Sequence, residues 1–301
     1  MKVLSLFDGI SSGRLALDRA GISVEEYHAY EIEPSAMKIS YNNYPDIIQH
    51  GNVIDADFSQ FKGFDLLFGA SPCQSLSICR AQDRQHLNGK SRLFYEFVRA
   101  LEEVQPKYFL FENVASMNDE SKVIISKHIG CEPIFLDASD FSAQRRPRYY
   151  WTNIPVSGDY EPSKLVLKDI LEHDVNAKYF YSCGYDLIDE SKPVIGTLHI
   201  TGYEMIKRIY STNYKSATIL CANGGNQQLK ILDNGNPRKL TPVECERLQT
   251  LPDNYTSGVA DVHRYNATGN GWCVDVIAHI LKGLSEPISN PINPKKLKTL
   301  W

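Results

Sequence analysis

Three segments of the chain carry side chains that could do chemistry together. Cys73 follows the apolar run 64–68 and a Gly-Ala-Ser-Pro sequence. Glu112 lies in a second apolar run, and Arg146 and Arg148 belong to a basic cluster. Because proline restricts the backbone just before the sulfur, the sequence predicts a thiol held in one direction at a strand end. A thiol, a carboxyl group and arginines at successive strand ends could add sulfur to an electron-poor ring.

Each of these residues also has an ordinary structural explanation. Taken alone, Cys73 fits an inert buried cysteine, Glu112 a strand-ending cap, and the arginines a solvated edge. An unperturbed thiol is only a few per cent ionised at neutral pH, so Arg146 or Arg148 would have to favour the thiolate. The chemical interpretation is favoured because the carboxyl ends of parallel strands meet at one edge of a sheet, where ligands bind.

Alternating strand and helix signals fill the first 150 residues and must position these side chains. We expect strands at 3–7 and 26–30 and near residues 47, 65, 108, 133 and 148. We expect helices at 14–20, 34–43 and 91–104, the second of them with a proline in its first turn. This alternation predicts an α/β fold with a doubly wound, Rossmann-like sheet.

The alternation stops near Trp151, where the composition of the chain changes. Residues 155–235 are rich in Gly, Asn, Ser, Thr and Tyr, which predicts a smaller, irregular β-rich domain. Its ordinary explanation is an insertion with no role beyond packing. A helix follows Thr241, the expected N-cap, with Glu244 as its capping-box partner. A last helix is expected at 273–284, where apolar residues recur at close to helical spacing.

Length and composition exclude several classes of protein. The 301 residues suffice for one large domain and a smaller one. No segment approaches the roughly 18 consecutive apolar residues of a membrane span. The apolar run at the N-terminus is too short for a signal peptide. We therefore expect an intracellular protein. Seven cysteines without a Cys-x-x-Cys pair argue against a disulfide framework or a zinc site, and no metal is expected.

Charge is distributed unevenly. The net charge of −4 argues against a nucleic-acid-binding protein. However, residues 205–240 hold six basic residues and one acidic residue, and residues 79–92 hold four and one. The sequence therefore predicts local positive regions that could hold phosphate groups.

The first strand is followed by a turn, 8–13, that could bind a nucleotide cofactor. It lacks the Gly-x-Gly-x-x-Gly pattern, so it suits a pyrophosphate poorly. Asp8 would repel phosphate and suit an amino-acid group or a positive charge, and Glu31 is placed to accept hydrogen bonds from ribose hydroxyls. These features favour S-adenosylmethionine over NAD. The alternative is an ordinary strand-to-helix turn.

Taken in order, these motifs resemble those of the DNA (cytosine-5) methyltransferases over nearly the whole chain. The family's cofactor turn, nucleophile loop and acid motif are similar to 7–13, 71–74 and 112–114. Its Gln-x-Arg-x-Arg motif matches 144–148. The helix that supports its recognition domain matches 238–248, and its last cofactor motif matches 269–276. Six motifs in one order make the resemblance specific.

The resemblance implies methyl transfer from S-adenosylmethionine to carbon 5 of cytosine in a short, specific double-stranded DNA site, leaving S-adenosylhomocysteine. Cys73 would attack carbon 6 of a base flipped out of the duplex. Glu112 would supply or share a proton at N3, and Arg148 would bind O2. The catalytic residues are thus predicted to be Cys73, Glu112, Arg146 and Arg148.

The resemblance also implies two sets of binding residues. The predicted cofactor-binding residues are Phe7, Asp8, Gly9, Ile10, Ser12, Gly13, Glu31, Ile32, Asn52, Val53, Ser71, Pro72, Leu93, Asn270, Gly271 and Trp272. The predicted DNA-binding residues are Gln74, Ser75, Arg80, Arg84, Lys207, Arg208, Tyr210, Ser211 and Thr218. In the first set, Phe7 would stack on adenine, and Asn52 stands where the family usually has an aspartate.

The family's organisation implies the division of the chain and its partners. Residues 1–175, completed by 262–301, would form the catalytic and cofactor-binding domain, and 176–261 the target recognition domain. Double-stranded DNA is the expected partner, and a cognate restriction endonuclease acting on the same site is a second. We expect a monomer in the cytoplasm, near the nucleoid, of a bacterial or phage-infected cell.

Three other functions remain as alternatives. An RNA cytosine-5 methyltransferase could use the same fold, but its relatives carry Phe-Thr after Pro-Cys, where this chain has Gln74-Ser75. A catalytically silent DNA-binding homologue is disfavoured by the intact Cys73, Glu112 and Arg148. A nicotinamide oxidoreductase is disfavoured by the missing glycine pattern.

Overall fold

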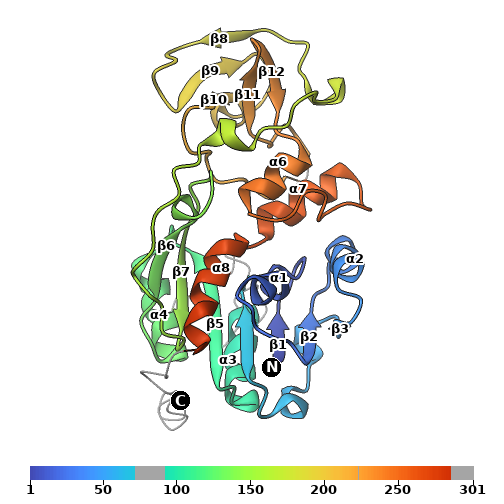
Figure 1. Cartoon of the computed structure of the whole chain (residues 1–301), viewed down its shortest axis with the longest axis vertical. Coiled ribbons are helices and arrows are strands. Elements are labelled where there is room, and N and C mark those ends of the chain that lie inside the picture. Colours follow the sequence, from blue (N-terminus) through green and yellow to red (C-terminus); the bar gives the residue numbers. More distant parts are fainter. Residues whose placement is uncertain (72–91, 223, 286–301) are drawn as a thin grey trace. The chain divides into compact units, whose positions relative to one another are not determined.

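The structure is a computed structural model that describes residues 1–71, 92–222 and 224–285. The chain forms two compact units (Figure 1). The first contains Met1–Leu136, Pro147–Asp159 and the residues from Ile277 onward, and the second contains Asp137–Arg146 and Tyr160–Val276. None of the described helices is both long enough and apolar enough to span a bilayer.

A seven-stranded sheet forms the centre of the first unit, in the order β3-β2-β1-β4-β5-β7-β6. Its strands are β1 (Lys2–Leu6), β2 (Glu26–Tyr30), β3 (Ile48–Gln49), β4 (Leu66–Gly69), β5 (Tyr108–Val114), β6 (Ile134–Asp137) and β7 (Pro147–Thr152). The pairs from β3 to β5 are parallel, whereas β7 runs antiparallel to β5. The predicted α/β class with a parallel-rich sheet is confirmed.

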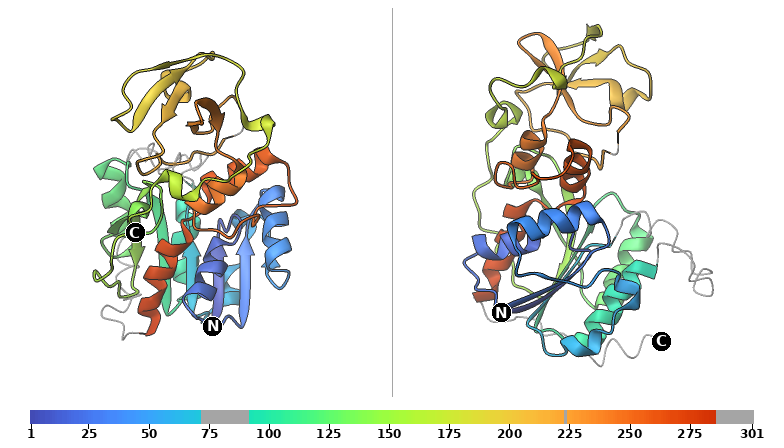
Figure 2. Two further views of the ribbon diagram at one scale, coloured as in Figure 1. Left: turned by 45° about the horizontal axis from the view of Figure 1, so that its top comes forward. Right: turned by 90° about the vertical axis from the view of Figure 1, so that its right-hand side faces the viewer.

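Helices lie on both faces of this sheet. They are α1 (Ser12–Arg19), α2 (Pro34–Asn43), α3 (Arg92–Val104), α4 (Asp119–Ile129) and α8 (Val274–Leu281), which begins in the second unit. Figure 2 shows α1 and α8 on one face and α3 and α4 on the other. Short 3-10 turns, η1 (Val53–Asp55), η2 (Phe58–Phe61) and η5 (Ala138–Asp140), connect the elements, and η8 (Lys282–Ser285) follows α8.

An aromatic core lies between the sheet and α3. The strands read as continuous apolar runs because both of their faces are covered. The largest side chains of the core come from η2, α3, β5 and β7, and include Phe58, Phe61, Phe94, Phe97, Phe109, Phe111 and Trp151. This core fixes the ends of β1, β4 and β5, where the chemical side chains begin.

The second unit is built on a five-stranded sheet in the order β12-β11-β10-β9-β8. Its elements are η6 (Leu167–Ile170), η7 (Ala177–Tyr179), β8 (Tyr185–Leu187), β9 (Val194–Leu198), α5 (Glu204–Lys207), β10 (Arg208–Tyr210), β11 (Lys230–Asp233), β12 (Asn236–Lys239), α6 (Pro242–Leu248) and α7 (Asp261–Asn270). The Thr241 side chain caps α6, and its capping box with Glu244 is present as predicted.

Candidate active site

The turn after β1 has an unusual backbone. Phe7, Gly9 and Ser11 all have positive φ, at 58°, 60° and 59°. Side-chain-bearing residues adopt this region at a cost, and such residues cluster where the surrounding structure holds them for a function. Here the turn directs the Gly9 N–H to Oε2 of Glu31, at 2.8 Å.

Glu31 is fixed at the end of β2 by the backbone. Its Oε1 accepts hydrogen bonds from the N–H groups of Ile32 and Glu33, at 2.8 Å each, in addition to the Gly9 bond at Oε2. A carboxylate offers about four lone-pair sites, so three backbone donors orient the group and leave Oε2 able to accept once more. This arrangement fits a ribose hydroxyl.

Two serines among the predicted cofactor-binding residues have unused hydrogen-bonding capacity. The Oγ atoms of Ser12 and Ser71 are buried and have no hydrogen-bond partner within the described part of the chain. Buried hydroxyls are normally paired, so these atoms are candidates to bind a ligand. The donor set of this edge therefore fits a nucleoside with polar substituents.

The other predicted cofactor-binding residues of the first unit differ in setting. Ile10 and Val53 are buried in the core, and Leu93 packs against it. Ile32 is 69% exposed. Asn52 caps η1 because its Oδ1 accepts the Ile54 N–H at 3.1 Å. The carboxamide of Asn52 is thus oriented by the backbone that follows it.

The candidate acid lies in β5 beside an arginine of β7. Nε of Arg148 is 2.7 Å from Oε1 of Glu112, and both side chains are largely buried. The sequence interpretation placed the arginines at a strand end, but Arg148 lies near the start of β7. Because β7 is antiparallel to β5, Arg148 pairs with Val114 and still reaches the carboxyl edge of the parallel strands.

Asn113 joins this acid to the segment that leads to the nucleophile. Its Nδ2 donates to the carbonyl of Ser71 at 3.2 Å, and its Oδ1 accepts the Val114 N–H at 2.8 Å. Ser71 precedes Cys73 by two residues. Cys73 itself lies outside the described residues, as do the other predicted site residues of this segment, Pro72, Gln74, Ser75, Arg80 and Arg84.

Comparison with known proteins decides which family uses this site. A family model for the C-5 cytosine-specific DNA methylases matches residues 1–286. The chain belongs to this family. It is therefore a DNA (cytosine-5) methyltransferase, as the order of its motifs predicts.

Characterised relatives match this methyltransferase along most of its length. It is 28% identical to the type II methyltransferase M.NlaX of Neisseria lactamica, over 96% of this chain and 97% of that protein. It is 26% identical to M.HhaI of Haemophilus parahaemolyticus, over 96% and 95% of the two chains. M1.ScrFI of Lactococcus lactis is 27% identical over 95% of this chain and 78% of its own length.

Solved structures show the same fold at lower identity. The Entamoeba histolytica methyltransferase EhMeth is similar with a TM-score of 0.73 and 18% identity, covering 94% of this chain and 97% of its own. The Dnmt2 methyltransferase of S. pombe has a TM-score of 0.68 and 18% identity, covering 95% and 99%. These likenesses support the methyltransferase fold and no finer property.

Arg146 has a different setting from Arg148 in this methyltransferase. It is 5% exposed, and its guanidinium donates to three backbone carbonyls of the second unit. These are Ile219 at 3.2 Å, Gly269 at 2.8 Å and Gly271 at 3.0 Å. These three bonds are made to the backbone, and the catalytic role predicted for Arg146 stays a prediction.

The last predicted cofactor motif lies at the junction of α7 and α8. Oδ1 of Asn270 accepts from the Cys221 thiol at 2.7 Å, and its Nδ2 donates to Asn266 at 2.6 Å. Gly271 ends α7 as its C-cap, and Trp272 is half-buried. The backbone of this junction is therefore held by Arg146 through Gly271, within the second unit.

The predicted DNA-binding residues of the second unit lie on and after α5 and β10. Lys207, Arg208 and Tyr210 are partly exposed, whereas Ser211 is buried and its Oγ accepts the Asn213 N–H. The Thr218 hydroxyl donates to the carbonyl of Arg145 at 2.6 Å. Of this group only Ser211 is buried, and Lys207, Arg208, Tyr210 and Thr218 are partly exposed.

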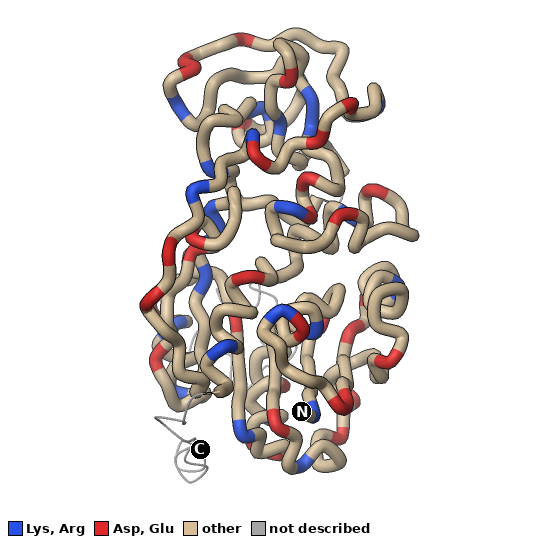
Figure 3. The backbone as a smooth tube through the Cα atoms, in the orientation of Figure 1, with Lys and Arg blue, Asp and Glu red and all other residues tan. Residues whose placement is uncertain are grey.

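The basic segment 205–240 does not form one positive surface. Lys230 and Arg238 are buried, and Nζ of Lys215 donates to the carbonyls of Ser139, Ser142 and Ser163. These three cations serve the fold of the second unit. Figure 3 shows acidic residues interspersed with the basic ones in this unit. The charge count along the sequence therefore overstated the positive region available to phosphates.

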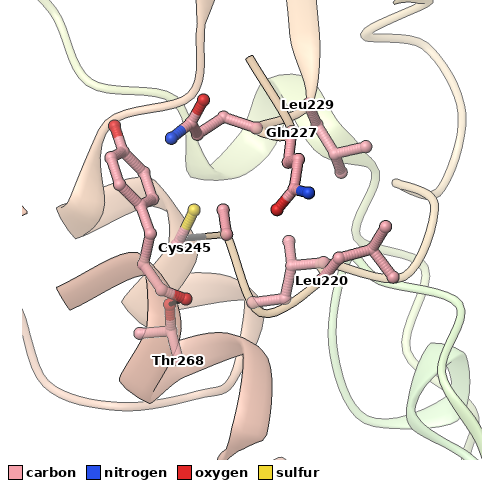
Figure 4. Close-up of a pocket in the computed structure, with 9 residues that line it drawn as sticks. Leu220, Gln227, Leu229, Cys245 and Thr268 are labelled. Carbon is pink, nitrogen blue, oxygen red and sulfur yellow. Dashed lines mark hydrogen bonds between the residues drawn. The ribbon is translucent and has the colours of Figure 1, made fainter. Parts of the chain in front are cut away.

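A small hollow lies in the second unit (Figure 4). It is lined by Ile219, Leu220, Ala222, Gln227, Gln228, Leu229, Cys245, Tyr265 and Thr268. Burial raises the pKa of the Cys245 thiol, so this cysteine stays protonated and is no rival nucleophile. No residue predicted for the site lines this hollow.

Proposed function

We propose that this methyltransferase uses S-adenosylmethionine to methylate carbon 5 of a cytosine flipped out of double-stranded DNA, through a covalent bond between Cys73 and carbon 6. The observation that supports it most is the connection made by Asn113. This side chain binds the carbonyl of Ser71, two residues before Cys73, from the strand that carries the Glu112–Arg148 pair. Ser71, Glu112 and Arg148 thus share one sheet edge.

Each side chain has a defined task in this proposal. The Cys73 thiolate forms the C–S bond at carbon 6, while Glu112 gives a proton to N3, so that carbon 5 becomes nucleophilic. Arg148 holds the Glu112 carboxyl and hydrogen-bonds O2 of the base. Once carbon 5 carries the methyl group, its proton passes to water, N3 returns its proton to Glu112, and the Cys73 thiolate leaves as the double bond between carbons 5 and 6 re-forms.

The cofactor edge of the first unit fits an S-adenosyl group. When bound, S-adenosylmethionine supplies an electrophilic methyl group. Glu31, oriented by three backbone N–H groups, would accept from the ribose, and the buried hydroxyls of Ser12 and Ser71 would bind polar substituents. Phe7 and Asn52 would contact the adenine.

We further propose that the enzyme acts as a monomer on a short site and protects that site from a cognate endonuclease. The type II names of several relatives favour this role, and the orphan methyltransferases of Bacillus phages SPR and rho11s favour a solitary one. An RNA substrate is the second candidate for the reaction, and Gln74-Ser75 after Cys73 speaks against it.

Methylation sequencing at single-base resolution tests the proposal. A plasmid would be carried in cells that express the chain, with Cys73→Ala as the matched control. We expect 5-methylcytosine at one short recurring motif with the wild-type chain and none with the variant. An unmethylated plasmid from folded wild-type protein would contradict the DNA reaction, and methylation by Cys73→Ala would remove Cys73 from its role.

A further inference from the structure

The carboxyl group of Asp8 is occupied by side chains of its own unit. Oδ1 accepts a hydrogen bond from the Tyr27 hydroxyl at 2.7 Å, and Oδ2 accepts one from the Ser11 hydroxyl at 2.5 Å. Both donors are buried, Tyr27 in β2 and Ser11 in the turn itself. The sequence interpretation gave Asp8 a charge directed at the cofactor, whereas the structure directs it inward.

These bonds hold the strained part of the turn. Asp8 lies between Phe7 and Gly9, and its Oδ2 binds the side chain of Ser11; all three neighbours have positive φ. A left-handed backbone is unfavourable at Phe7 and Ser11 and persists only where other contacts enforce it. The Asp8–Ser11 bond closes the turn on itself, and the Tyr27 bond anchors it to β2.

The hydrogen bonds continue from Ser11 to the next elements of the cofactor edge. The hydroxyls of Ser11 and Ser40 are 2.6 Å apart, and Nε2 of Gln49 lies 3.1 Å from the Ser40 hydroxyl. Ser40 belongs to α2, and Gln49 ends β3, three residues before Asn52. One chain of side chains therefore connects β2, the turn, α2 and β3.

We propose that Asp8 is a positioning residue that presents the cofactor turn through Tyr27 and Ser11, and that its negative charge is not what binds the cofactor. This inference rests on the proposed use of S-adenosylmethionine. It explains how the Gly9 N–H is kept on Glu31, because Gly9 follows Asp8 directly. Burial raises the pKa of Asp8, against the lowering effect of its hydroxyl partners, which accords with an internal carboxyl group.

Two substitutions of Asp8 separate shape from charge. In Asp8→Asn the remaining oxygen still accepts from Tyr27, and the new amide donates to the Ser11 oxygen, which can also accept. In Asp8→Ala both bonds are lost, together with the hydrogen bond to the Ser5 side chain. If the turn is positioned by hydrogen bonds, the Asn variant keeps cofactor affinity and the Ala variant loses it. If the charge binds the cofactor, both variants lose it alike.

The measurement is calorimetric binding of S-adenosylmethionine and S-adenosylhomocysteine to the full chain. We expect Kd to rise about tenfold or more in Asp8→Ala, in line with loss of hydrogen bonds to a charged group, and to stay within about threefold in Asp8→Asn. Tyr27→Phe should raise Kd several-fold without removing the charge, and Tyr41→Phe, on an exposed tyrosine of α2, should not. KM for the cofactor should follow Kd while kcat is unchanged.

Each other outcome overturns the inference. Equal loss of affinity in Asp8→Asn and Asp8→Ala would assign the charge a direct role, and unchanged affinity in Asp8→Ala or Tyr27→Phe would deny the network any role. Thermal unfolding of each variant without ligand shows whether Asp8→Ala is folded, and Tyr27→Phe decides the question if it is not. If the wild-type chain binds neither ligand, the proposed function fails, and this inference fails with it.

Discussion

Glu112 and Arg148 show how a single ion pair fixes the orientation of the carboxyl group that we propose as the acid. The carboxyl group is held at 2.7 Å by Nε of Arg148, in a largely buried setting that keeps its orientation fixed. Glu112→Gln keeps an oxygen for that bond but cannot give a proton to N3. We expect the methylation rate to fall by about a hundredfold or more, since a positioned general acid contributes on that scale.

Single-turnover incorporation of labelled methyl groups measures this effect. DNA affinity and the unfolding midpoint of Glu112→Gln should stay close to wild type, because shape and hydrogen bonding are kept. Glu120→Gln, an exposed glutamate of α4, is the matched control and should leave the rate unchanged. A Glu112→Gln enzyme with wild-type rate would take the proton transfer away from this residue.

Lys230 should make the free energy of unfolding of the second unit depend on pH, with a sign that follows from its lowered pKa. Its Nζ donates to the carbonyls of Asn226 and Gln228, at 2.5 and 2.7 Å, and burial lowers its pKa from 10.5 to about 8. Between these pH values the unfolded chain binds more protons than the folded one, so the free energy of unfolding rises with pH. The full destabilisation of the folded chain by the buried Lys230 charge is present below the folded pKa, and it disappears above pH 10.5.

Denaturant unfolding of the wild type and of Lys230→Met at pH 8 and pH 10 tests this dependence. Relative to Lys230→Met, the wild type should gain about 2 kcal/mol of unfolding free energy between these two values. The same comparison with Lys164→Met, at an exposed lysine, should give nearly parallel curves. A constant difference between wild type and Lys230→Met would mean that Lys230 has an ordinary pKa in the folded chain.

At the scale of elements, α7 approaches the segment 219–222 so closely that only glycine fits. A Cβ atom on Gly269 would lie 2.3 Å from the carbonyl oxygen of Leu220 and 2.5 Å from the backbone nitrogen of Cys221. Both are backbone atoms, so the helix itself would have to move. Arg146 depends on the same approach, because it donates to Gly269 and Ile219 at once.

Gly269→Ala should therefore destabilise the fold by about 1–3 kcal/mol, the usual cost of overpacking. Urea unfolding measures the change, and Gly158→Ala is the control, since a Cβ there has open space and no positive φ is involved. The control should lie within about 0.5 kcal/mol of wild type. Equal stability of the two variants would show that α7 shifts at little cost.

Local sequence patterns predicted where helices and strands begin and end, but they could not predict features that depend on long-range contacts. The bounds of β2 and α2 follow from a strand signal that closes before Glu31 and from a proline at the start of a helix. The direction of β7 could not be predicted, because an apolar run reads the same in a parallel or an antiparallel pair. The sequence of residues 216–220 predicted a strand. In the structure these residues form no strand, and Ser216 makes an isolated β-bridge with Gln144.

The candidate site was predictable where a motif names its residues, and not where a partner is distant in sequence. Glu112 and Arg148 are adjacent to strand signals, and the structure brings the two side chains together, whereas their catalytic roles stay predictions. The Tyr27–Asp8 bond joins residues 19 positions apart, and nothing in either local pattern marks a phenol as the partner of that carboxyl group. The three carbonyl partners of Arg146 lie more than 70 residues away, so no local pattern could indicate these bonds.

At the scale of the whole molecule, the chain passes between the two compact units four times. The predicted recognition domain, 176–261, was bounded by family resemblance, and that division stays a prediction about function. The side-chain packing of the second unit extends beyond residues 176–261. The larger apolar cluster in the described part of the second unit has ten buried residues, of which Ala143, Leu167, Ile170 and Tyr265 lie outside 176–261, while a smaller cluster of Ile195, Leu198 and Ile209 lies inside it. Gln144, also outside it, donates to Leu248 and accepts from Ile219.

Two fragments of the chain can test whether the predicted recognition domain or the compact second unit is the part that folds on its own. Residues 137–276 contain the whole second unit, so we expect a cooperative denaturant transition from them. Residues 176–261 lack four of the ten cluster residues and both Gln144 and Arg146, so the carbonyls that these two side chains bind would lose their partners. We therefore expect a broad, weakly cooperative transition from the shorter fragment. Equal cooperativity of the two would mean that recognition and packing share the same boundaries, because the flanking residues would then contribute nothing that the shorter piece needs to fold.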